Sequence, residues 1–172
     1  IPATKLGGVT YDTTVYTVTV TVSDKGDGTL NVVLGAGSAS PTGLNFTNTY
    51  AASGVLNLAG TKTLTGRVLG IGEFSYELWE GATLIETVAN GAGGSIAFST
   101  INYTLANVGI HTYTVKEVIP ATKLGGVTYD TTIYTVIVTV SDKGDGTLNV
   151  VLDPGSANPA GLNFTNIYAA TG

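Results

Sequence analysis

Lys62, Glu117 and Asn166 are the residues of this sequence whose types could carry out a reaction with one another. A neutral amine can attack the carbon of a carboxamide when a nearby acid polarises the carbonyl. The product is a side-chain amide, or isopeptide, and one ammonia is released. The chemistry therefore depends on whether the fold brings an amine, a carboxyl and a carboxamide together.

Each of the three residues falls on the apolar side of a predicted strand. Alternation with period two places Asn166 on the face of Leu162 and Phe164. Lys62 lies on the leucine side of its segment, and Glu117 lies on the side of a tyrosine and a valine. Lys and Glu are almost never fully buried without a partner, and a buried carboxamide also needs hydrogen bonds. Their shared burial predicts that they contact one another.

Burial disfavours charge, so the expected state is a neutral Lys62 amine beside a protonated Glu117 carboxyl that donates to the Asn166 carbonyl. Enforced proximity would supply much of the remaining rate enhancement. The reaction occurs once per molecule, so the sequence predicts a self-modifying protein and not an enzyme. Glu80, at the end of another alternating segment, is the alternative acid.

Each residue also has an ordinary structural interpretation. Lys62 would be a lysine that extends to solvent near a strand end. Glu117 would be an edge carboxylate paired with Lys116 or Lys123, and Asn166 would be a turn or bulge amide. The isopeptide interpretation is favoured because it accounts for all three residues at once.

An internal repeat organises the chain. Residues 1–54 align without a gap with residues 119–172 and differ from them at only eight positions, whereas residues 55–118 occur once. The sequence therefore predicts that 1–54 is the second half of a preceding repeat and that 55–172 is one complete repeat of 118 residues. We expect the chain to be a window from a longer tandem array.

Asn48 is the counterpart of Asn166 in the half-repeat. No lysine-bearing strand precedes it in this chain, and Lys62 can bond only one asparagine. Two alternatives remain open: Asn48 is unbonded, or it is served by a lysine from a preceding repeat or another chain.

Short alternating segments separated by glycine-rich turns predict an all-β fold. Residues 15–22 alternate apolar residues with Thr, residues 24–28 form a hairpin turn, and residues 44–50 read as a further strand. The sequence shows no segment with both helical periodicity and caps. This pattern favours a β-sandwich of immunoglobulin-like size.

The composition narrows the functional classes. The chain of 172 residues is 43% hydrophobic but only 11% charged, with a net charge of −5, which argues against nucleic-acid binding and against membrane contacts through basic residues. No apolar run is long enough to span a bilayer. The sequence has no Cys and a single histidine, His111, so we expect no metal site and no cofactor.

Four ordered motifs carry a resemblance to a known family. Residues 60–67 (GTKTLTGR), 73–78 (EFSYEL), 113–117 (YTVKE) and 164–168 (FTNIY) resemble the streptococcal pilin isopeptide linkage domain. That family is found in backbone pilins and repetitive surface adhesins of Gram-positive bacteria. It is related in architecture to the collagen-adhesin B-type domains. The resemblance implies a Lys62–Asn166 isopeptide bond promoted by Glu117.

The resemblance also implies a function. We expect a structural repeat of an extracellular cell-surface filament, pilus or adhesin stalk, whose partners are neighbouring repeats or identical subunits. The alternative is a ligand-binding adhesin module that recognises a host glycan or protein, with the outward-facing Trp79 as one contact. We expect no nucleic-acid partner and no membrane insertion within this segment.

Overall fold

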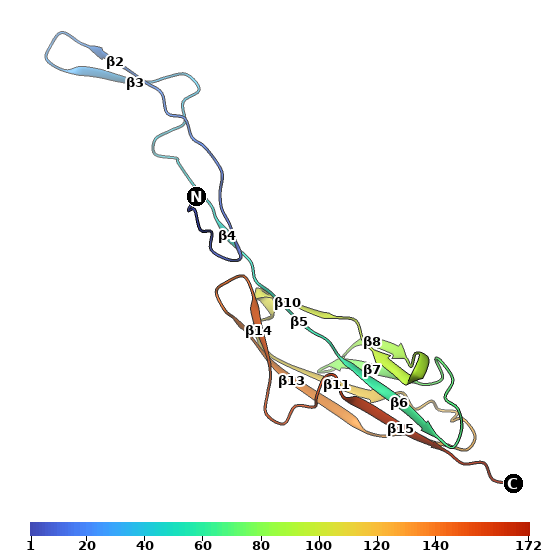
Figure 1. The fold of residues 1–172 in the computed structure, drawn as a ribbon. Helices are drawn as coiled ribbons and strands as arrows, with labels where there is room; N and C mark the ends of the chain where they lie inside the picture. The colour runs from blue at the N-terminus through green and yellow to red at the C-terminus, as the bar shows by residue number, and fades with distance from the viewer. The chain divides into compact units, whose positions relative to one another are not determined.

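The computed structural model describes residues 1–172, which form two compact units, Ile1–Ala51 and Ala52–Gly172 (Figure 1). None of the helical segments has the length and apolar character needed to cross a membrane.

The second unit is built almost entirely from strands. In chain order they are β5 (Ser53–Leu56), β6 (Ala59–Thr65), β7 (Ser75–Glu80), β8 (Thr83–Ala89), β9 (Ser95–Ala97), β10 (Ile101–Thr104), β11 (Gly109–Glu117), β12 (Val127–Thr128), β13 (Ile133–Asp142), β14 (Leu148–Leu152) and β15 (Leu162–Tyr168). Two 3₁₀ turns of three residues each, η1 (Ala92–Gly94) and η2 (Leu105–Asn107), are the only helical elements.

Two main sheets form the layers of a β-sandwich. One has the strand order β14-β13-β11-β7-β8, and the other has the order β12-β15-β6-β9. The two-stranded sheet β10-β5 completes the unit. The predicted all-β, immunoglobulin-like sandwich is therefore confirmed.

The core lies between the layers because each strand alternates apolar and polar residues. Val136, Val138 and Val140 of β13 are buried, and the Tyr76 ring packs against Phe164 of the opposite sheet at 5.1 Å between centroids. Aromatic and β-branched side chains that interleave in this way supply most of the buried apolar surface of a sandwich.

One strand pair is parallel, whereas every other pair of adjacent strands in the two main sheets is antiparallel. In this pair β6, near the start of the unit, lies beside β15, near its end (Figure 1). The approach is close at Gly60, where a Cβ atom would lie 1.8 Å from the Leu162 carbonyl oxygen.

The first unit contains only short strands. They are β1 (Val9–Thr10), β2 (Val20–Asp24), β3 (Leu30–Leu34) and β4 (Thr49–Tyr50), paired as β1-β4 and β2-β3. The strands predicted over 15–22 and 44–50 are thus only partly formed. The near-identical copy forms the longer β13 and β15 in the second unit, where each has strands on both sides.

We expect Gly60→Ala to destabilise the second unit, because the added methyl group would collide with the β15 backbone. A loss of about 1–3 kcal/mol is typical of such overpacking. The midpoint of urea unfolding measures it.

The matched control is Gly125→Ala, since no atom lies within 4 Å of the Cβ position there and the backbone is not left-handed. Equal midpoints for the two variants would show that the β6–β15 approach is not tight.

Candidate functional site

The β6–β15 pair positions two of the three predicted residues. Lys62 is in register with Phe164, so Asn166 lies two residues further along the neighbouring strand and on the same inward face. Such diagonal neighbours are within reach of a long side chain. Glu117 is the last residue of β11, in the opposite sheet, and also points inward.

The structure brings Lys62, Glu117 and Asn166 together. Lys62 Nζ lies 2.6 Å from Glu117 Oε2, and Asn166 Nδ2 donates to Glu117 Oε1 at 2.6 Å. All three residues are buried, with exposed fractions of 3%, 5% and 0%. One carboxyl therefore bridges the amine and the amide nitrogen. The arrangement differs from the expectation that Glu117 would contact the Asn166 carbonyl.

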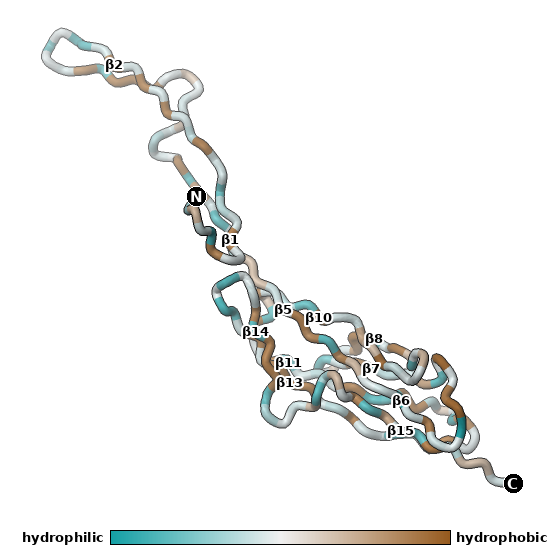
Figure 2. Tube along the Cα trace, viewed as in Figure 1, coloured by the Kyte–Doolittle hydropathy of each residue, from teal (hydrophilic) through white to brown (hydrophobic).

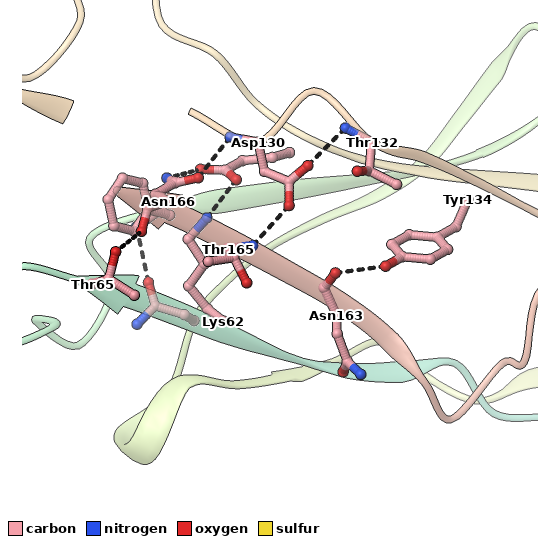
Figure 3. Close-up of polar contacts among 11 residues, drawn as sticks. Lys62, Thr65, Asp130, Thr132, Tyr134, Asn163, Thr165 and Asn166 are labelled. Carbon is pink, nitrogen blue, oxygen red and sulfur yellow. Dashed lines mark hydrogen bonds and ion pairs between the residues drawn. The ribbon is translucent and has the colours of Figure 1, made fainter. Parts of the chain in front are cut away.

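The Asn166 carbonyl has another partner, because Asp130 donates its backbone N–H to Asn166 Oδ1 at 2.7 Å (Figure 3). The Asp130 carboxylate in turn accepts from the backbone N–H groups of Thr165, at 2.7 Å, and Thr132, at 2.9 Å. These bonds attach the loop before β13 to β15. They hold the Asp130 amide against the Asn166 side chain.

Sequence reasoning missed Asp130. A weak signal exists, because Asp followed two residues later by Thr is typical of a turn in which the side chain bonds to the backbone. That signal predicts the bond to Thr132 but not the contact with Asn166, which lies 36 residues away. Burial alone would raise the pKa of Asp130, but the hydrogen bonds from Thr132 and Thr165 lower it overall, so the carboxylate stays ionised as an acceptor.

One aromatic ring packs against the amine, and a second buried ring belongs to the same core. Lys62 Nζ lies 4.7 Å from the centre of the Phe74 ring, and the Tyr76 side chain is buried with a hydroxyl that has no hydrogen-bond partner. Burial lowers the pKa of Lys62, and the hydrogen bond and charge of Glu117 only partly oppose this effect. The environment thus favours the neutral, nucleophilic amine.

The other predicted residues lie elsewhere. Glu80, the alternative acid, has its Oε1 2.7 Å from His111 Nδ1. Asn48 is exposed in the first unit, where its Oδ1 accepts from the Asp12 backbone N–H at 2.9 Å. Trp79 donates to Glu77 at 3.0 Å.

The sequence matches one protein-family model, described as FctA, the Spy0128-like isopeptide-containing domain, over residues 2–51 and 58–169. The chain belongs to this family. The resemblance inferred from the four motifs is therefore confirmed. A search of curated proteins finds no match to this chain.

Solved structures similar to this chain include the major pilin from Streptococcus pyogenes. It matches with 21% identity and a TM-score of 0.38, over 66% of this chain and 50% of the pilin chain. Two mutants of that pilin match with 18% identity and TM-scores of 0.41 and 0.37 over the same shares. The chain thus spans 50% of the pilin chains that it matches.

The lowered pKa of Lys62 predicts a pH dependence in a chain that cannot react, such as Asn166→Ala. Below the ordinary lysine value of 10.5, the unfolded chain binds a proton that the folded chain has partly released. The free energy of unfolding should therefore rise with pH up to that value. Urea unfolding between neutral pH and 10.5 measures it.

The control is the double variant Lys62→Met/Asn166→Ala, which lacks the lysine. Its free energy of unfolding should not show the rise with pH that comes from Lys62. If both variants show the same slope, Lys62 carries its ordinary proton in the folded state.

Proposed function

We propose that residues 52–172 form a structural domain which cross-links itself through an isopeptide bond between Lys62 and Asn166. The observation that carries this proposal is the bridging carboxyl. Its two oxygens lie 2.6 Å from the reacting amine and 2.6 Å from the amide nitrogen that must leave. A purely structural ion pair would need no carboxamide on the second oxygen.

Glu117 acts in this proposal as a proton relay. Lys62 Nζ gives a proton to Oε2 and attacks Asn166 Cγ as a neutral amine. The Nζ–Cγ bond forms, the Glu117 carboxyl passes this first proton to Nδ2, and Oε2 then takes a second proton from Nζ. The Cγ–Nδ2 bond breaks and ammonia leaves, so Glu117 ends in the protonated form.

The Asp130 backbone N–H stabilises the charge that develops on Asn166 Oδ1 during the attack. Its 2.7 Å contact is made before the reaction begins, and the Asp130 side chain fixes the loop that carries it. A donor that is already in place needs no reorganisation, which is the basis of oxyanion stabilisation.

The bond would join a strand near the start of the domain to its last strand. Tension that enters through β6 and leaves through β15 would then pass through a covalent link instead of separating the sheet. The two linked residues, 62 and 166, are 104 positions apart in the sequence. In the chain-entropy treatment used for disulfides, closing a loop of this length adds about 4–5 kcal/mol of stability.

We further propose that the chain is part of an extracellular, cell-surface filament, with identical subunits or neighbouring repeats as its partners. Membership of the isopeptide-containing domain family supports this role. A protein under tension outside a cell benefits from a link that, unlike a disulfide, cannot be reduced.

The intact mass under denaturing conditions should be lower than the sequence mass by one ammonia. Peptide mapping should find Lys62 joined to Asn166. Lys62→Met and Glu117→Ala should each restore the full mass, because the first removes the nucleophile and the second removes the proton relay.

Glu80→Ala is the matched control and should still lose one ammonia, since Glu80 contacts His111 and not the reacting groups. A full, unmodified mass for the wild-type chain would refute the cross-link.

Asp130→Ala should slow bond formation about ten- to hundredfold, because the loop that holds the amide donor loses its bonds to β15. A time course of intact mass after cell-free synthesis gives the rate.

The matched control is Asp12→Ala, which removes the equivalent side chain from the first unit only. Equal rates for Asp130→Ala and the wild type would mean that the loop does not position the reacting amide.

A further inference from the structure

The first unit presents an apolar surface that is covered in its near-identical copy. Phe46 is 61% exposed, whereas its counterpart Phe164 is 0% exposed. Val20 is 49% exposed, whereas Val138 is 0% exposed. The two strands of the β2–β3 hairpin carry exposed apolar residues (Figure 2). An apolar surface of this kind marks an interaction site.

The second unit shows which strands cover the equivalent apolar surface there. There, β13 has β11 at one edge and β15 has β6 at one edge. Both of these neighbours, and the Tyr76 ring that packs on Phe164, come from residues 55–118. Because 1–54 differs from 119–172 at only eight positions, the surface that it presents fits the same complement.

In the first unit Asn48, the counterpart of Asn166, makes the same backbone contact through its side-chain oxygen. Asp12 donates its backbone N–H to Asn48 Oδ1 at 2.9 Å, and the Asp12 carboxylate accepts from Thr47 at 2.8 Å and Thr14 at 2.8 Å. These contacts reproduce those that Asp130 makes around Asn166.

The aromatic support is reproduced as well. The Tyr16 and Phe46 rings meet edge to face at 5.2 Å and 88°, as Tyr134 and Phe164 do. The contacts of Asp12 with Asn48 and of Tyr16 with Phe46 therefore form without the strands that carry the lysine and the glutamate.

We propose that residues 1–54 are a docking and cross-linking site for a segment of the residue 55–118 type from another repeat of this kind. This inference rests on the proposed function, since it assigns the same chemistry to a second asparagine. The segment adds one strand parallel to residues 44–50 and one antiparallel to residues 15–22. It covers Phe46 and Val20 and places its own lysine and glutamate beside Asn48.

The covalent step has the same bonds formed and broken as the proposed reaction between Lys62 and Asn166. The incoming neutral amine forms an Nζ–Cγ bond with Asn48, and the Cγ–Nδ2 bond breaks. The glutamate of the segment takes a proton from Nζ and delivers one to Nδ2, and ammonia leaves. The chain's own Lys62 does not serve this site, because Glu117 already holds it beside Asn166.

The test adds a synthetic peptide of residues 55–118 to the full chain. We expect an adduct whose mass is that of the two components less one ammonia, with the peptide's lysine joined to Asn48. Thr49 distinguishes the Asn48 peptide from the Asn166 peptide, which carries Ile167. Asn48→Ala should abolish the adduct, and Phe46→Asp should abolish both the adduct and binding.

A second arm extends the full chain with a copy of 55–118 before Ile1, which removes any dependence on the solubility of the peptide. The intact mass should then be lower by two ammonias, and Asn48→Ala should reduce the loss to one. Hydrogen exchange of the amides of 20–24 should slow in the extended chain, because β2 gains a strand neighbour.

The outcomes separate this proposal from the proposed function. If the extended chain loses one ammonia and its 20–24 amides exchange as before, the docking site is refuted while the Lys62–Asn166 bond stands. If the amides are protected but no ammonia is lost at either site, docking is supported and the cross-link is refuted. Self-association in which residues 1–54 of two copies pack against each other, and which Phe46→Asp abolishes, would overturn the proposal, because the occupant would then not be a 55–118 segment.

Discussion

A single buried carboxyl is the constraint on which the structure of the site depends. Glu117 lies between two sheets, with an amine on one oxygen and an amide on the other. A carboxyl, an amine and a carboxamide are each costly to bury alone. Placed together, they satisfy one another, and the apolar surroundings that make them costly also favour the neutral amine. The burial that makes these groups costly is therefore also the cause of the lowered pKa of Lys62.

The parallel β6–β15 pair is the feature that makes this contact possible. It sets two distant parts of the chain in a register that leaves Lys62 and Asn166 as diagonal neighbours. Gly60 permits the close approach of the two strands. The loop that carries Asp130 then fixes the orientation of the amide.

The two units show how two near-identical segments behave with and without strands from residues 55–118 beside them. Residues 133–142 form a ten-residue strand between two neighbours, whereas their copy forms strand only over Val20–Asp24. Local contacts, such as the hydrogen bonds of Asp12 with Asn48 and Thr47, persist in the copy because both partners belong to residues 1–54. Extended strands and buried apolar faces do not persist, because they depend on hydrogen bonds and cover from 55–118.

The sequence by itself determined the fold class, the repeat and the identity of three core-facing polar residues. Strand alternation has a period of two, so the side on which Lys62, Glu117 and Asn166 lie can be read from their neighbours. Only the tertiary structure decided which atoms meet. That Glu117 contacts Asn166 Nδ2, and that the Asp130 amide contacts Oδ1, depends on the separation of the sheets and on a loop conformation. The same limit applies to residues 15–22 and 44–50, because strand length is set by partners that periodicity does not reveal.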